Sequence, residues 1–206
     1  MEILKKSFIA FAIIFQSIAT VAQTDAAMQN DFSESYSLEY NKKYTDAIAV
    51  LSKYKSDNSY ELSVRLGWLQ FSNKNYTQSM QLYQRAITLK PYSIEAKLGL
   101  IKPLSALESW EKVLQQYEDI LKIDQQNYTA NYWAGVINYN RKKYEVAAKY
   151  FERIVNLYPF DYDANHMMAW TCLFGGRAND AKTLFNKALL IKPSDTSCLE
   201  GLSKLK

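Results

Sequence analysis

Catalysis and metal binding need polar side chains that converge on one point, and this chain has few residues of the types that do such work. Its 206 residues include one histidine, His166, and no pair of acidic residues stands out as an acid–base couple. A hydrolytic triad or a multi-histidine metal site needs more than this one side chain. The pair Gly175–Gly176 is typical of a hairpin turn, and no phosphate-binding glycine motif is present. We therefore predict a protein that is not an enzyme, with no catalytic residue, no metal and no cofactor.

Composition favours a helical protein that uses aromatic residues for binding. The chain is 48% hydrophobic, so it can bury a core, and it has only 6 Gly and 4 Pro. A formal net charge of +4 without a Lys/Arg block is too small and dispersed for a nucleic-acid interface. Aromatic residues make up 14% of the chain, and 16 of them are Tyr. This is more than a small core needs, so some should reach the surface.

The first 22 residues have the pattern of a secretory signal peptide. Lys5 and Lys6 precede an uncharged, mostly apolar run from Phe8 to Ala22, and small residues end the run. We expect cleavage after Ala22 and a periplasmic or secreted protein with no stable membrane insertion. The alternative is an uncleaved anchor, but a run this short falls below the ~20 residues that span a bilayer.

Export places Cys172 and Cys198 where disulfides can persist. Cys172 is expected near the end of one helix and Cys198 near the start of the next parallel helix. The two positions are therefore offset by about eight helical residues, or roughly 12 Å along the helix axis. This exceeds the ~7 Å limit between the Cα atoms of a disulfide. We predict two unpaired, partly buried thiols.

The elements that must position these residues repeat every 34 residues. The repeat is marked by five residues of the types that cap helix N-termini: Ser59, Ser93, Asn127, Asp161 and Asp195. Proline lies two residues before three of them, where it ends the preceding helix. Counting from the residue after each cap, small or apolar residues recur at positions eight, seventeen, twenty, twenty-four and twenty-seven. This spacing predicts two helices per repeat, packed on one another and on their neighbours.

The pattern resembles the tetratricopeptide-repeat family. One repeat carries the family's residues at Leu66–Gly67, Tyr83, Ala86 and Pro91, and another carries them at Gly135, Ala147, Phe151 and Pro159. The resemblance implies an all-α, right-handed α-solenoid of about five hairpins, with a mature domain over residues 23–206. The predicted repeats are 26–59, 60–93, 94–127, 128–161 and 162–195, and the first is two residues short. A capping helix over 196–206 should follow, with Leu199, Leu202 and Leu205 facing inward.

Pro103 departs from this pattern because it lies ten positions into the first helix of the third repeat. An interior proline costs about 3 kcal/mol in a helix. We expect a kink or an early break near Lys102.

The family's concave surface is lined by positions two, five, nine, twelve and thirteen of each repeat. Carried onto this chain, these positions give a mainly aromatic groove. Its predicted partner-binding residues are Trp68, Phe71, Tyr132, Tyr139, His166 and Trp170. The same positions include Ser105, Val136, Asn140 and Phe174. The alternative is that these aromatic residues belong to the core.

The leading functional interpretation is an exported adaptor or scaffold that binds a segment of another protein or a peptide in this groove. The alternative is a module that binds glycan or peptidoglycan, because aromatic surfaces also stack on sugars. A third interpretation is an oligomeric scaffold that extends through its ends.

Overall fold

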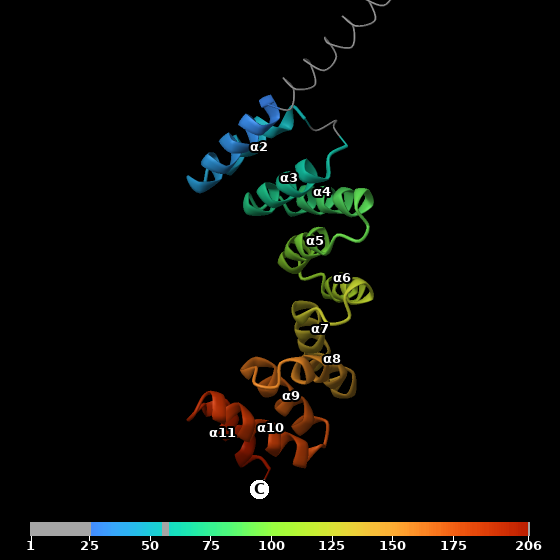
Figure 1. Ribbon diagram of the computed structural model, residues 1–206, viewed down its shortest axis with the longest axis vertical. Helices are drawn as coiled ribbons and strands as arrows, with labels where there is room; N and C mark the ends of the chain where they lie inside the picture. The colour runs from blue at the N-terminus through green and yellow to red at the C-terminus, as the bar shows by residue number, and fades with distance from the viewer. Residues whose placement is uncertain (1–25, 55–57, 206) are drawn as a thin grey trace, which may run out of the picture. The chain divides into compact units, whose positions relative to one another are not determined.

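The computed structural model describes residues 26–54 and 58–205, and every regular element within them is a helix. The helices follow one another in pairs joined by short turns (Figure 1). This confirms the all-α prediction. The chain divides between Leu89 and Lys90 into two compact units, and each is described by itself. The predicted signal peptide, residues 1–22, lies outside the described residues.

Over residues 26–54 and 58–89, the N-terminal unit consists of two helical hairpins. Residues 26–40 are helical and are followed by α2 (Tyr44–Ser52), and the second hairpin consists of α3 (Tyr60–Ser72) and α4 (Tyr76–Leu89). Their shared core is aliphatic and fully buried, comprising Ala47, Leu51, Leu62, Leu66 and Leu69.

The C-terminal unit contains three hairpins and one further helix. The hairpins are α5 (Ile94–Ala106) with α6 (Trp110–Ile123), α7 (Tyr128–Asn140) with α8 (Tyr144–Leu157), and α9 (Tyr162–Phe174) with α10 (Ala178–Ile191). The final helix is α11 (Thr196–Ser203). The largest fully buried side chains of the C-terminal unit are Phe151 and Phe185, and alanines surround them.

The five predicted cap residues all cap helices. In each case the side-chain oxygen accepts the backbone N–H of the residue three positions on, as from Asp161 to Ala164 at 2.7 Å. Each such bond satisfies one of the orphan N–H groups of the first turn and contributes about 1 kcal/mol. The 34-residue punctuation of the sequence therefore marks where these helices begin.

The turn inside each hairpin also recurs. The N–H of Lys142 donates to the carbonyl of Tyr139 at 2.8 Å, and the N–H of Lys143 donates to that of Asn138 at 2.9 Å. This pair of hydrogen bonds requires one residue of the turn to adopt the left-handed backbone conformation, with a positive φ. That residue is Lys42, Lys74, Glu108, Lys142 or Gly176 in successive hairpins. The first interval is two residues shorter than the others, as the sequence predicted.

The two helices of a hairpin cross at positions eight and twenty-four. A Cβ atom on Gly135 would lie 2.7 Å from the ring of Phe151, and one on Gly67 would lie 3.1 Å from the ring of Tyr83. Glycine is therefore needed there for a close approach. The α5/α6 hairpin has Ile101 at the same position, and it packs less closely than the hairpins on its C-terminal side.

The predicted early break at Pro103 is wrong. Helix α5 continues through this residue to Ala106, and the N–H of Leu107 still donates to the carbonyl of Pro103 at 3.1 Å. Pro103 lies in the last turn, so its ring removes only one hydrogen bond, the one toward Gly99. Its side chain is fully buried, which offsets that loss. A bend of the axis at this point stays a prediction.

The predicted inward face of the last helix is wrong at one residue. Cys198 and Gly201 are buried and Leu202 and Leu205 pack against the core, but Leu199 is 48% exposed. A Cβ atom on Gly201 would lie 2.2 Å from the ring of Phe185, so the glycine edge of α11 faces α10. Because Gly201 faces α10, Leu199 lies on the exposed side of α11.

Two further observations concern the cysteines and membrane insertion. Cys172 and Cys198 are free and buried, more deeply than the sequence predicted. Within residues 26–54 and 58–205, none of the helices has the length and apolar character that crossing a bilayer requires.

Candidate binding surface of the C-terminal unit

The structure distributes the six predicted partner-binding residues over both units, and all six are half-buried. Trp68 and Phe71 lie on α3 in the N-terminal unit, with their ring centroids 5.8 Å apart. The indole N–H of Trp68 donates to Glu39, which also pairs with the buried Arg65. These contacts give Trp68 a structural role in its unit.

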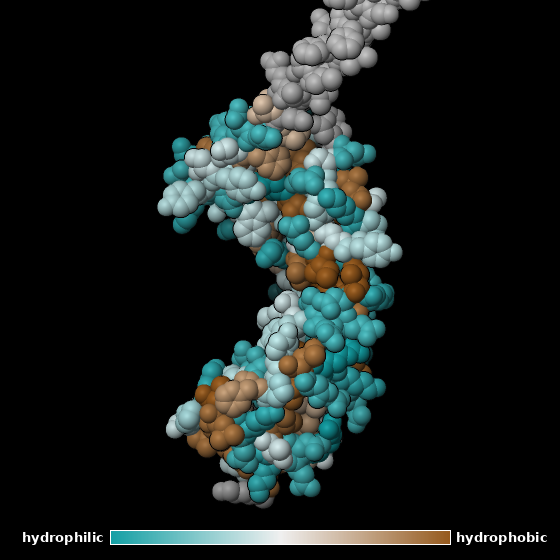
Figure 2. Space-filling model, viewed as in Figure 1, coloured by the Kyte–Doolittle hydropathy of each residue, from teal (hydrophilic) through white to brown (hydrophobic). Residues whose placement is uncertain are grey.

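Three of the predicted residues come together in the C-terminal unit. Tyr139 on α7 and His166 and Trp170 on α9 line a hollow of about 410 Å³. Met167 and Phe174 of α9 complete its apolar part, and Ser197, Glu200 and Lys204 enter it from the α11 segment. We call this surface the α9–α11 groove. Figure 2 shows apolar residues gathered over α11 and the adjoining end of α9.

Aromatic rings form the floor of the α9–α11 groove. Trp170 and Phe174 stack with centroids 5.5 Å apart, and Tyr139 lies 6.1 Å from Phe174. Trp170 also makes a T-shaped contact with the buried ring of Phe185, which holds it in position. Phe174 stays 48% exposed. The groove therefore offers rigid aromatic faces, of the kind that anchor bound side chains.

A polar cluster lies beside these rings. The indole N–H of Trp170 donates to Ser197 Oγ at 3.0 Å and to His166 Nε2 at 3.2 Å, and Ser197 Oγ lies 2.8 Å from His166 Nε2. Because an indole N–H can only donate, His166 Nε2 acts as an acceptor and the ring is neutral. Burial lowers the pKa of His166, which favours the same neutral form.

The Ser197–His166 contact has the length of a nucleophile–base pair, but the pair lacks a third member. Among the described residues, no carboxylate hydrogen-bonds His166 Nδ1 to orient the ring as a triad would require. The same serine oxygen accepts a hydrogen bond from Trp170. The arrangement is therefore suited to fixing Trp170 and His166 in the groove wall.

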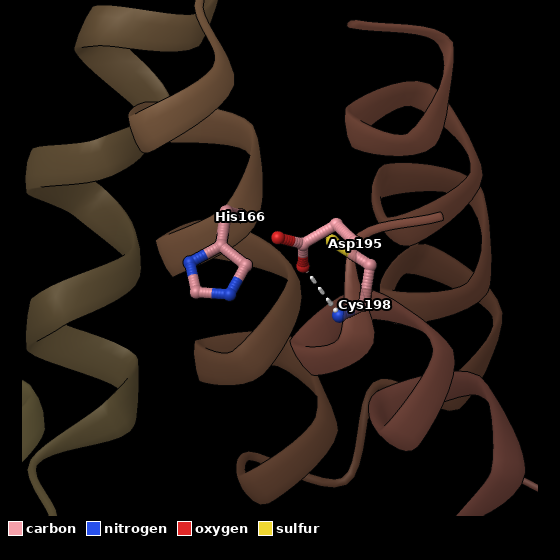
Figure 3. Close-up of side chains that lie close together, drawn as sticks. All are labelled: His166, Asp195 and Cys198. Carbon is pink, nitrogen blue, oxygen red and sulfur yellow. Dashed lines mark hydrogen bonds between the residues drawn. The ribbon is translucent and has the colours of Figure 1, made fainter. Parts of the chain in front are cut away.

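Sequence reasoning did not foresee that His166, Asp195 and Cys198 would converge. Their potential ligand atoms lie within 4.8 Å of one another, with His166 on α9 and the other two at the start of α11 (Figure 3). A nitrogen, an oxygen and a sulfur ligand would suit a zinc-like ion. However, Asp195 accepts from the N–H of Cys198 at 2.9 Å and from the hydroxyl of Tyr162.

These hydrogen bonds give the converging groups a structural role. The backbone N–H of Cys198, followed by the Tyr162 hydroxyl, lowers the pKa of Asp195. Burial, followed by the neighbouring Asp195, raises the pKa of the Cys198 thiol to about 12. These contacts join the start of α11 to α9, because Tyr162 belongs to α9 while Asp195 caps α11.

Tyr132 is separate from the α9–α11 groove. It stacks on Tyr128 and meets the rings of Trp133 and Phe151 edge-on. In the C-terminal unit, the sequence thus predicted three groove residues that come together and one that does not line the same hollow.

The α11 side of the groove was missed, although the sequence contained the signal. Asp195 begins a sixth period, so Ser197, Glu200 and Lys204 occupy positions two, five and nine of a further first helix. These are positions that line the groove in earlier repeats. The sequence interpretation treated this segment only as a cap. Glu200 and Lys204 form an ion pair of 3.1 Å at the rim.

Comparison with known proteins identifies the repeats of this chain as tetratricopeptide repeats. Models of the tetratricopeptide repeat match residues 32–94, 96–162 and 162–195. The BBSome complex member BBS4 from Bos taurus is 28% identical over 121 residues. That match covers 56% of this chain but only 23% of BBS4.

Several solved structures share the fold. A tetratricopeptide repeat protein from Parabacteroides merdae superposes with a TM-score of 0.74 at 19% identity, covering 87% of this chain and 72% of its own. YrrB, described as a TPR protein with an unusual peptide-binding site, has a TM-score of 0.70 at 14% identity, covering 90% of this chain and 97% of its own. MamA has a TM-score of 0.70 at 16% identity, with coverages of 81% and 92%. At these identities the likeness extends to the fold alone.

Proposed function

This chain belongs to the tetratricopeptide-repeat family, and from this premise we propose that it is a non-catalytic adaptor of the cell envelope or secretory space. It binds a segment of a partner protein in the α9–α11 groove. Repeats of this family form scaffolds for protein–protein interaction. Catalysis, nucleic acid and a cofactor have no part in the proposal.

The observation that carries the proposal is the convergence of groove positions from three helices. Tyr139, His166 and Trp170 line one hollow with Ser197, Glu200 and Lys204 of the α11 segment. Glu200 and Lys204 occupy the repeat positions of His166 and Trp170 one period later. An aromatic floor supplies apolar contact area, and Ser197, Glu200 and Lys204 supply hydrogen bonds and charge at the edge. This combination suits a peptide, which presents side chains and an unsatisfied backbone together. A peptide-binding site in YrrB and membership of an assembly in BBS4 are consistent with it.

The envelope location rests on the predicted signal peptide over residues 1–22. Amino-terminal sequencing of the protein isolated from its own cells tests it. A mature chain beginning at Gln23, recovered from an envelope or secreted fraction, supports the location. An intact leader on a cytoplasmic protein would refute it.

A displayed library of random dodecapeptides tests the groove. We expect the purified protein to select a peptide family, and Phe174→Ala to weaken the selected peptides at least about tenfold, the effect of losing a hot-spot residue. Ser197→Ala should weaken them less. Phe160→Ala is the matched control, since this phenylalanine is 66% exposed outside the groove.

The outcomes separate the candidate ligands. Binding that persists in Phe174→Ala and disappears in Phe160→Ala would place recognition elsewhere. If no peptide is selected, and the protein instead sediments with peptidoglycan in a Phe174-dependent manner, the glycan alternative replaces this proposal.

A further inference from the structure

Successive hairpins of the C-terminal unit meet at equivalent junctions, and one junction is filled by aromatic rings. Where the α7/α8 hairpin meets α9, Tyr139 and Tyr144 lie 5.8 Å apart and Phe174 stacks on Tyr144 at 5.8 Å. Phe174 also contacts Tyr139 at 6.1 Å. These three rings occupy the space between the hairpin and the next helix.

The preceding junction lacks two of these rings. The residues 34 positions earlier are Ser105, Trp110 and Asn140. Small polar side chains thus stand where the next junction has Tyr139 and Phe174, and only the ring at the place of Tyr144 is retained, as Trp110. The substitution removes most of the material that would fill the space between α5/α6 and α7.

A cavity of about 510 Å³ lies at this place. Its apolar walls include Trp110, Val113 and Tyr117 of α6 and Trp133, Val136 and Ile137 of α7, with Ser105 and Asn140 also lining it. We call it the α5–α7 cavity. At the next junction, the equivalents of Ser105, Val136 and Asn140 are Tyr139, Trp170 and Phe174, which line the α9–α11 groove. The cavity there that is bordered by Tyr144, Thr171 and Gly175, the equivalents of Trp110, Ile137 and Arg141, measures only about 150 Å³. The larger volume lies in the range of ~300–1,000 Å³ that is usual for ligand pockets.

Two observations indicate that the α5–α7 cavity is accessible and suits an aromatic guest. Trp110 and Trp133 are each 46% exposed, so two indole faces are available from outside. The buried Tyr117 provides a third ring, and burial raises its pKa to about 12, so it presents no charge. Aromatic walls favour an aromatic guest over an aliphatic one through stacked and edge-on contacts.

The rim of the α5–α7 cavity is polar. Arg141 and Glu111 form an ion pair of 2.9 Å there, and Glu111 is 85% exposed. The hydroxyl of Ser105 and the amide of Asn140 add donors and acceptors. A peptide backbone that crosses the rim therefore has partners while its side chain enters.

We propose that the α5–α7 cavity binds an aromatic side chain of the partner segment. The guest ring takes the place that Tyr139 and Phe174 fill at the next junction. The inference rests on the proposed function, because it assumes that the ligand is a protein segment, and it adds an anchor site with a defined side-chain preference.

The indole N–H signals test this site directly, because the chain has only four tryptophans. The purified ¹⁵N-labelled protein is titrated with N-acetylphenylalaninamide, and each indole signal is assigned with a Trp→Phe variant. We expect saturable shifts at Trp110 and Trp133 and none at Trp68. N-acetylleucinamide should bind more weakly.

Filling the cavity from inside provides the matched pair of variants. Ser105→Phe restores a ring at the missing position and should abolish the shifts while raising the unfolding midpoint. Ser105→Ala keeps the space and should leave the affinity within about twofold, since it removes only a rim hydroxyl. Shifts that persist in Ser105→Phe, or that centre on Trp170, would overturn the proposal.

The displayed peptides separate this inference from the proposed function. If it holds, the selected peptides share an aromatic residue at a fixed position and bind Ser105→Phe at least about tenfold more weakly. Peptides that depend on Phe174 but bind Ser105→Phe normally would refute the anchor site and leave the groove intact. Peptides whose binding is weakened by Ser105→Phe but not by Phe174→Ala would refute the groove as the binding surface and leave the anchor site intact.

Discussion

The α5/α6 and α7/α8 hairpins share caps and turns but differ at the point where their helices cross. Ser93 and Asn127 cap α5 and α7 in the same way, and Glu108 and Lys142 adopt the same left-handed conformation. At the crossing, α7 has Gly135 against Phe151, whereas α5 has Ile101, with Tyr117 at the place of Phe151.

This difference separates two kinds of information in the repeat. Caps and turns determine where each helix begins and ends, and they tolerate changes at the crossing. The residues at the crossing determine how closely the helices approach. The α5/α6 hairpin keeps the register of the repeat, yet its junction with α7 retains the α5–α7 cavity.

The largest test of this comparison is to introduce a branched side chain into the close crossing. Gly135→Val would place a Cβ atom 2.7 Å from the ring of Phe151, which is fully buried. We expect a loss of about 3 kcal/mol or more, at the upper end of overpacking in a core. Urea unfolding followed by circular dichroism measures it.

The matched control is Ile101→Val in the looser hairpin. It should cost only about 1 kcal/mol, the usual effect of one buried methylene group. If Gly135→Val cost no more than this control, the close crossing would not be a constraint in α7/α8.

A second, smaller difference separates α7/α8 from α9/α10. Asn131 and Asn165 occupy the same repeat position, and each donates to the carbonyl of the residue four positions earlier, at 2.9 and 2.6 Å. Arg153 donates to Asn131 Oδ1 at 3.3 Å. The residue 34 positions after Arg153 is Lys187, and Asn165 Oδ1 is buried without a partner among the described residues.

Lys187→Arg should therefore transfer the missing hydrogen bond to α9/α10. We expect a gain of about 1 kcal/mol in the free energy of unfolding, because a buried acceptor is costly when it is left unpaired. Arg153→Lys should lose a similar amount. An unchanged unfolding midpoint in both variants would contradict this account of the pair.

The sequence predicted most of the helical framework for a physical reason. Caps act on groups only three residues apart, and the αL turns act over five or six, so local spacing is sufficient to locate them. Pro103 and Leu199 were misjudged because their outcomes depend on packing, namely a buried last turn in α5 and the close contact of Gly201 with Phe185.

The candidate site was only partly predictable for the same reason. Repeat position identified Tyr139, His166 and Trp170, because one helix face repeats in register. The α5–α7 cavity exists because Ser105 and Asn140 lack the aromatic rings found one period later in the sequence. A search for matching residues detects side chains that are present and overlooks rings that are missing. Comparing the residues of each junction with those 34 positions later would have identified the cavity, since Ser105 is replaced by Tyr139 and Asn140 by Phe174.

The smallest expected effect concerns pH and distinguishes α9 from α7 at one repeat position. Tyr132 occupies this position in α7, and its hydroxyl stays neutral because burial raises its pKa. His166 occupies it in α9, and burial lowers its pKa below the usual value of about 6.5. The unfolded chain therefore binds more protons than the folded one between these two values. The stabilisation is complete above pH of about 6.5 and is lost as the pH falls through the folded-state pKa.

Urea unfolding at pH 7.5 and 5.5 measures this effect, with His166→Gln as the control. The wild type should lose stability over this interval, and the variant should lose less, because the chain has no other histidine. The low pKa of Asp195 contributes in a separate, more acidic range, below its usual value of about 4. Equal losses in the two proteins would mean that protonated His166 keeps its place beside Trp170 and Ser197. In that case the contact between α9 and α11 would not need the neutral ring.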